Sequence, residues 1–61
     1  MGRRIQKAMD VAGETPATIA PKLEVSRVAV VQWRSGTNNP RLKHLLKLAA
    51  LCGVTLDSLV A

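Results

Sequence analysis

Four side chains near the middle of the chain could read the edges of DNA bases. Ser26, Arg27, Val28 and Gln32 share one face of the segment Val25–Trp33 if that segment is helical. Arg27 can donate two hydrogen bonds to guanine, Gln32 can pair with adenine, and Val28 can contact a thymine methyl group. The alternatives are that Arg27 and Gln32 are solvated surface residues and that Val28 packs inward.

The opposite face of this segment is apolar, with Val30 and Trp33 at helical spacing. Its centre is rich in β-branched residues, which on propensity alone would also suit a strand. Ser26 is a good helix N-cap, and the spacing of Val30 and Trp33 is helical rather than alternating. We therefore predict a helix from the Ser26 cap to about Arg34.

A second helix is predicted just before it, from Thr15 to Leu23. Thr15 suits the N-cap and Pro16 the first helical position. Its apolar face consists of Ile19, Ala20 and Leu23. Two short helices joined by a tight turn on a basic chain indicate a helix-turn-helix DNA-binding unit.

Three further helices are predicted by the apolar spacing. The first spans about Arg3 to Ala12, with Ile5, Ala8, Met9 and Ala12 on its apolar face. The fourth runs from Pro40 or Arg41 to Cys52, with a stripe of Leu42, Leu45, Leu46, Leu48, Ala49 and Cys52. The last is short, from Leu56 to about Val60 after a Thr55 cap. The fold class expected is therefore all-α, a compact five-helix domain over residues 1–61.

Composition narrows the class of partner. The 61 residues suffice for one domain, and the net charge of +5 with a pI of about 10.4 favours a polyanion. Charge alone leaves acidic substrates and anionic membranes open. No apolar run approaches the ~20 residues that span a bilayer.

The chain lacks the residue groups that catalysis would need. It has no paired carboxylates and no nucleophile–base set, so we expect no enzyme activity. Cys52 is the single cysteine and lies in an apolar run, which predicts a small buried hydrophobe and suits the cytosol. His44, the single histidine, is expected to be exposed or near phosphate. We expect no metal, no cofactor and no small-molecule ligand.

The order of these signals resembles the Cro/lambda-repressor (Cro/C1-type) family of phage and bacterial helix-turn-helix regulators, and most of all a small phage Cro repressor. The resemblance covers about Thr15 to Val60. It rests on the joint spacing of Ala20, Val25, Val30, Trp33 and Pro40, followed by a Leu-rich helix that ends in Gly53-Val54. It implies a lambda-repressor-like domain that binds palindromic, double-stranded operator DNA as a homodimer and represses transcription, with the third helix in the major groove.

The resemblance also implies roles for individual residues. The base-facing set would be Ser26, Arg27, Val28 and Gln32. Phosphate contacts would come from Thr15 and Thr18 at the start of the second helix, from the loop residues Thr37, Asn38 and Asn39, and from Arg41. A weak dimer would form through Leu56, Ser58 and Val60 near the C-terminal end. A cytoplasmic protein of a bacterial host cell, or of its nucleoid, is expected.

Three features depart from the family pattern. Glu24 occupies the turn position that usually carries Gly, so either it accepts a strained left-handed conformation or the turn differs. Pro21 predicts a kinked or tightened second helix. Where the family often pairs an Arg with a Glu, this chain has Met9 and Arg34, which leaves Arg34 free for phosphate or for Asp10.

Two other functions remain open. An antitoxin-like protein would share the DNA-binding fold and use an apolar surface to hold a partner protein. A basic amphipathic peptide could instead lie on a membrane surface, although the ordered caps and turns count against that interpretation.

Overall fold

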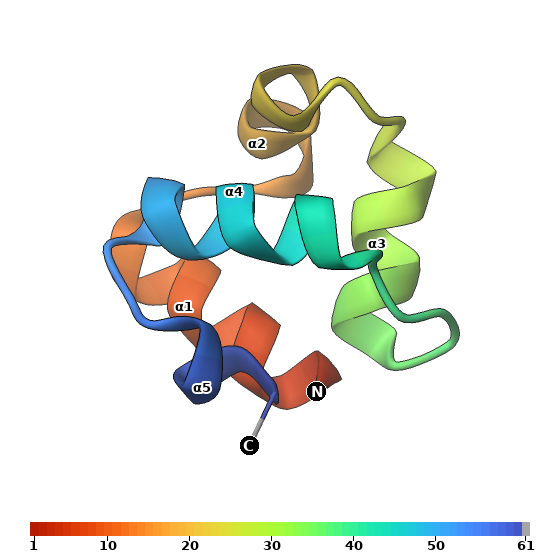
Figure 1. The fold of residues 1–61 in the computed structure, drawn as a ribbon. Helices are drawn as coiled ribbons and strands as arrows, with labels where there is room; N and C mark the ends of the chain where they lie inside the picture. Colours follow the sequence, from red (N-terminus) through yellow and green to blue (C-terminus); the bar gives the residue numbers. More distant parts are fainter. Residues whose placement is uncertain (61) are drawn as a thin grey trace.

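The computed structural model describes residues 1–60, which form five α-helices and no strand in that range (Figure 1). They are α1 (Gly2–Ala12), α2 (Pro16–Leu23), α3 (Arg27–Ser35), α4 (Leu42–Cys52) and α5 (Leu56–Val60). The predicted all-α, five-helix fold is confirmed. The predicted helix ends lie within one or two residues of the observed ones.

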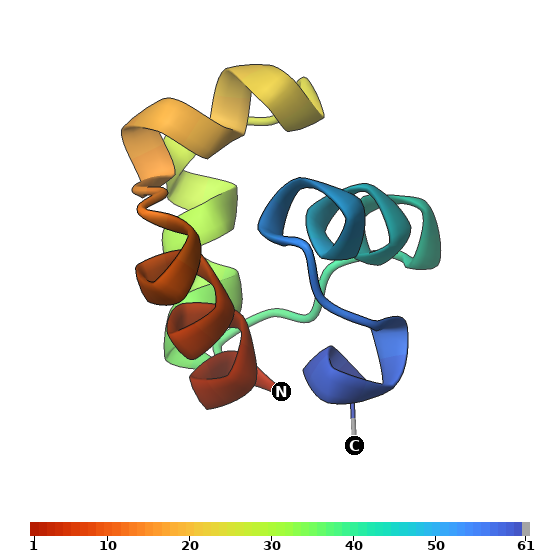
Figure 2. The same ribbon diagram turned by 90° about the vertical axis from the view of Figure 1, so that its left-hand side faces the viewer.

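The helices surround a single core. In Figure 1, α4 crosses the front, with α2 above it, α3 beside its first turn and α5 below it. Figure 2, turned by 90°, shows α1 and α3 on one side, α4 and α5 on the other and α2 across the top, with both chain ends in the lower part. Helix α1 packs against α3, α4 and α5, and α2 packs against α3 and α4. The chain between α2 and α3 is a short turn, as the helix-turn-helix prediction requires.

Side-chain caps set the start of the helices. The Oγ1 of Thr15 accepts a hydrogen bond from the backbone N–H of Thr18 at the start of α2, and the backbone N–H of Thr15 donates to the Oγ1 of Thr18. The Oγ of Ser26 accepts from the N–H of Ala29 at the start of α3. Each cap satisfies N–H groups that a helix leaves unpaired at its first turn. The Ser26 cap helps to explain why a β-branched segment is helical.

The core confirms most of the predicted apolar positions. Its buried residues are Ile5, Ala8, Met9, Ile19, Ala20, Leu23, Val30, Trp33, Leu45, Leu48, Ala49, Cys52 and Leu59. Cys52 is buried among them as predicted, and burial raises the pKa of its thiol. The thiol therefore stays protonated at neutral pH and acts as a small hydrophobe.

Three predicted core positions are wrong. Ala12 is exposed because it lies in the last turn of α1, where the chain leaves the core toward Gly13. Leu42 and Leu46 are 62% and 52% exposed. The predicted apolar stripe of α4 is too broad, because the helix buries only the side that carries Leu45 and Leu48.

Helix α1 approaches the end of α3 very closely at Gly2. A Cβ atom at this position would lie 2.7 Å from the carbonyl oxygen of Arg34 and 2.9 Å from the backbone nitrogen of Gly36. Both atoms belong to the backbone and cannot move aside cheaply. Only glycine therefore lets the first turn of α1 rest against the last turn of α3 without displacing it.

Glu24 adopts the strained left-handed conformation, one of the two outcomes expected for the turn between α2 and α3. Its φ of 58° and ψ of 41° are left-handed, and it is the only non-glycine residue with positive φ in residues 1–60. The next residue, Val25, donates its N–H to the carbonyl of Ala20. This bond closes α2 in the way that a C-terminal glycine usually does. Helix α2 continues across Pro21 without a break.

The ion pairing also differs from the family pattern. The described residues contain one salt bridge, between Lys22 and Glu14 at 2.8 Å, and no pair joins Arg34 to Asp10. The Nε atom of Arg34 is buried without a hydrogen-bond partner. The option of an Asp10–Arg34 pair is therefore not realised.

We predict that Glu24→Gly stabilises the protein. A left-handed non-glycine residue costs about 1 kcal/mol, and part of the gain is lost to the greater freedom of Gly in the unfolded chain, so we expect a net gain of about 0.5 kcal/mol. Urea unfolding measures it. Glu24→Ala is the control, because it removes the same charge and keeps the Cβ atom. An equal gain in both variants would assign the effect to charge and contradict the strain.

Candidate nucleic-acid interface

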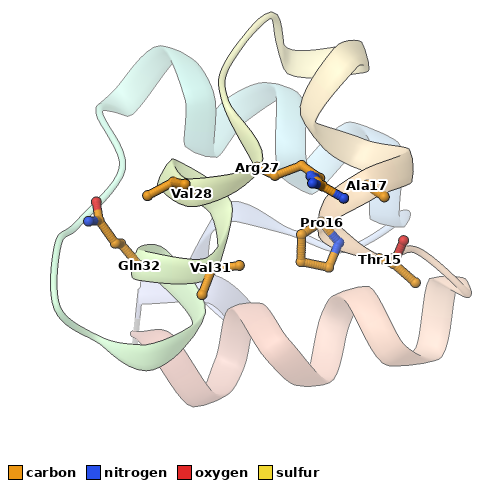
Figure 3. A pocket seen from close by; sticks show the side chains of 7 residues that line it. All are labelled: Thr15, Pro16, Ala17, Arg27, Val28, Val31 and Gln32. Carbon is orange, nitrogen blue, oxygen red and sulfur yellow. The ribbon is translucent and has the colours of Figure 1, made fainter.

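An open groove of about 460 Å³ runs between the start of α2 and the outer face of α3. Its lining residues are Thr15, Pro16, Ala17, Arg27, Val28, Val31 and Gln32. Figure 3 shows Arg27 reaching from the first turn of α3 across the groove toward Ala17, whereas Val28 and Gln32 point away from α2. The structure therefore brings three of the four predicted base-facing residues onto one surface with the predicted phosphate residue Thr15.

The two faces of α3 differ in solvent exposure, as the sequence predicts. Val30 and Trp33 are 0% and 6% exposed, whereas Val28 is 64% exposed. The alternative that Val28 packs inward is therefore excluded. Ser26 is exposed at the start of the helix, where its hydroxyl oxygen accepts the cap bond and its proton remains available to an acceptor.

Gln32 is held in place by the loop that follows α3. The side-chain amide of Asn38 donates to the Oε1 of Gln32 at 2.8 Å, and the backbone N–H groups of Thr37 and Asn38 donate to the Gln32 carbonyl. The Oγ1 of Thr37 also lies 2.9 Å from the Oγ of Ser35. The structure thus links a predicted base contact to the loop predicted to clamp phosphate. Asn39, at the end of this loop, is exposed.

The two threonines at the start of α2 differ in what they can offer. The hydroxyl of Thr18 donates its single proton to the Oε1 of Glu14 at 2.7 Å, with the carbonyl oxygen of Thr15 at 3.0 Å as the competing acceptor. The hydrogen bonds from Lys22 and then from Thr18 lower the pKa of Glu14, so a carboxylate lies beside Thr18. Thr18 therefore serves the helix cap, and its hydroxyl proton is committed. Thr15 lines the groove itself.

Several cations lie near His44 on α4. Of the two options predicted for His44, exposure is wrong because the residue is half-buried, and a place near phosphate stays a prediction. The ring lies 5.4 Å from that of Trp33 between centroids, and its Nδ1 is buried without a hydrogen-bond partner. Burial is the main cause of its lowered pKa, and the cations Lys43, Arg41 and Lys47 add to it. The local potential is therefore positive next to the predicted phosphate residue Arg41.

The predicted dimer residues lie on α5 with different exposures. Val60 is 43% exposed, Leu56 is half-buried against the core, and Ser58 is exposed. The Oγ of Ser58 donates to the carbonyl of Thr55. The apolar surface that α5 presents to solvent is consequently small.

Val31 is the clearest residue that the sequence analysis did not assign to the site. It is 50% exposed and lies in the groove between α3 and Pro16. Its spacing of three residues from Val28 places it on the same side of a helix, so this signal was present in the sequence. The bond from Asn38 to Gln32 had no such signal, because it depends on how the loop folds back.

Two kinds of feature are absent from residues 1–60. No helix among them is long and apolar enough to cross a membrane. No group of three or more His, Cys, Asp or Glu side chains is placed to hold a metal ion.

The comparisons with known proteins agree with this geometry. A family model described as helix-turn-helix matches residues 5–59, which include both helices that border the groove. No curated protein and no solved structure matches the chain.

We predict that stability depends on the protonation of His44. Because the folded pKa lies below the ordinary value of 6.5, the unfolded chain binds more protons than the folded chain near that pH. The free energy of unfolding is therefore highest above pH 6.5 and falls as pH drops toward the folded pKa.

Thermal unfolding of wild type and His44→Gln between about pH 7.5 and 5.5 tests this, since carboxylates titrate mostly below that window. The variant should lose Tm less steeply than wild type as pH falls. Identical pH slopes would contradict the assignment to His44.

Proposed function

The chain belongs to the Cro/C1-type helix-turn-helix family of DNA-binding regulators, and we propose that it is a transcriptional repressor of the small phage Cro type. It would bind palindromic operator DNA as a homodimer and block a promoter by covering it. The observation that carries the proposal is the outer face of α3, where a charged and two apolar side chains are exposed and the amide of Gln32 is half-buried, on a helix whose other face is buried.

The proposal places α3 in the major groove, with its first residues at the bases. Arg27 would donate two hydrogen bonds to guanine, and Gln32 would pair with adenine while Asn38 holds its amide in position. Val28 and Val31 would contact thymine methyl groups. Ser26, at the N-cap, has a hydroxyl proton to donate to a base or a phosphate.

Phosphates would be held on both sides of α3. On one side, the start of α2 offers the Thr15 hydroxyl and the positive end of the helix dipole, and Thr18 supports this end through the cap. On the other side, the loop residues Thr37 and Asn39 and the guanidinium of Arg41 would contact the backbone. Lys43 and Lys47 add positive charge beyond Arg41. Such a protein would act in the cytoplasm of a bacterial cell, at its nucleoid.

Dimerisation would use the exposed side of α5 around Leu56, Ser58 and Val60. The exposed Leu42 and Leu46 of α4, the helix on which α5 packs, offer further apolar surface. Helix α5 alone presents few exposed apolar side chains, whereas a stable interface buries roughly 800 Å² per partner. The dimer would therefore be weak and would form on DNA.

The direct test is selection of bound sequences from a random DNA pool, followed by binding measurements on the selected site. Arg27→Ala should relax the preference at one base position, because it removes a base contact. Arg41→Ala should weaken binding to all sequences and lower the salt slope by about one, because it removes a phosphate contact.

Arg3→Ala is the matched control, since it removes the same charge from an exposed position of α1 outside the groove. It should leave the base preferences unchanged. Selection that yields no preferred sequence, or an Arg27→Ala variant with unchanged base preferences, would overturn the proposed recognition.

The dimer makes a separate prediction. Wild type should sediment as a monomer at micromolar concentration and occupy a palindromic operator in two copies, with half-site centres about 34 Å apart. Val60→Asp should weaken the two-copy complex and leave binding to an isolated half-site unchanged. A tight dimer in the absence of DNA would contradict the weak interface.

A further inference from the structure

A second groove lies on the opposite side of α1 from α3. Its volume is about 250 Å³, and it is lined by Arg4, Lys7, Ala8, Val11, Val54 and Ser58. None of these residues lines the groove in Figure 3. Residues 4, 7, 8 and 11 share one face of α1 by their spacing, whereas Gly2 rests against the end of α3. The second groove is therefore separate from the face proposed to meet DNA.

The groove is lined by both apolar and cationic side chains. Ala8, Val11 and Val54 supply the apolar side chains, and Val11 is 76% exposed, the most exposed large hydrophobic residue described. Arg4 and Lys7 supply the positive charge, and Nη1 of Arg4 also donates to the carbonyl oxygen of Ser58 at 3.5 Å. Such a surface suits a ligand that carries both carboxylates and apolar side chains.

Within residues 1–60, no acidic side chain forms a salt bridge with the cations at this end of α1. Arg3, Arg4 and Lys7 lie in the first two turns, at the positive end of the helix dipole, and the first turn contains no acidic residue. Cations are unfavourable there, whereas an anionic partner would be attracted both by the side chains and by the helix. No salt bridge in residues 1–60 involves these three residues.

The side chains that line the groove favour an anion other than phosphate. Arg4 and Lys7 line the groove together with Ser58 of α5, and the apolar side chains beside them make no favourable contact with a phosphate backbone. A second copy of this chain is also a poor occupant. The chain carries a net charge of +5, and its four acidic residues, Asp10, Glu14, Glu24 and Asp57, are scattered.

We propose that the α1/α5 groove is a docking site for an acidic, partly apolar peptide segment of another protein. Its apolar side chains would cover Ala8, Val11 and Val54, and its carboxylates would pair with Arg4 and Lys7. Because the groove lies apart from α3, the partner would leave the face proposed to meet DNA uncovered. Ser58 lines the groove and also lies on the proposed dimer surface, so the partner would compete with the dimer there. The inference goes beyond DNA recognition and does not depend on the operator.

The test uses a fluorescent 14-residue probe peptide with leucines at helical i, i+4 spacing and Glu or Asp at the remaining positions. Titration into the isotope-labelled full chain should shift the backbone amide signals of residues 4–11, 54 and 58, and leave those of residues 27–32 in place. Two further peptides, with the acids changed to Gln or the leucines to Ser, should each bind at least about tenfold more weakly, a loss of about 1.4 kcal/mol.

The variant Lys7→Gln/Val11→Ser should weaken binding of the acidic peptide by about tenfold, whereas the matched control Leu46→Ser/Lys47→Gln should change it by less than about twofold. Both pairs remove one charge and one exposed apolar side chain. The single variant Lys7→Gln should give an intermediate loss, and circular dichroism verifies that each variant is folded.

Several results would overturn the proposal. One is a peptide that shifts the amide signals of α3 instead of those of the groove residues, because it would then bind as a DNA mimic. Equal losses in the two double variants would indicate unspecific charge attraction. Self-association that Val11→Ser abolishes would assign the groove to a second copy, and groove shifts on anionic vesicles but not on the peptide would assign it to a membrane. DNA binding, measured separately, stands or falls independently of each.

Discussion

The burial of one side of α3 determines what the rest of the molecule can do. Val30 and Trp33 are almost fully removed from water, and each such side chain favours the folded state by about 1.5–3 kcal/mol. Because these buried side chains fix the rotation of α3 about its own axis, Arg27, Val28 and Gln32 must project outward. The Ser26 cap starts the helix, and the left-handed conformation of Glu24 sets the turn that leads from α2. The outward direction of these side chains is thus a consequence of core packing.

Positive charge is distributed over more than one surface. The face of α3 has Arg27 at its start and the cations of the α4 region at its flank, where they add to burial, the main cause of the lowered pKa of His44. A second group of cations lies on α1, against α5 and away from α3. Net charge alone predicts a polyanion partner, but only the arrangement of the helices separates the part of that charge suited to DNA from the part suited to a protein.

The sequence predicts the helices well because their signals are local. Caps, glycine ends and apolar spacing act within one or two turns, and the two faces of α3 follow directly from them. The features that the sequence could not predict are the exposures and side-chain contacts that depend on residues distant in the chain. Leu42 and Leu46 have the right spacing for a core stripe, yet no helix covers them. His44 is half-buried because Trp33 lies beside it. The hydroxyl of Thr18 donates its proton to the carboxylate of Glu14. Each outcome is set by tertiary contact.

The central claim is that the exposed face of α3 meets the base edges. Intermolecular nuclear Overhauser effects between the isotope-labelled protein and its selected operator test it most directly. We predict contacts from the methyl groups of Val28 to thymine methyl or other major-groove protons, and none from the methyl groups of Val11 on α1. A specific complex in which Val28 shows no contact to DNA, while side chains of α1 or α5 do, would contradict the account.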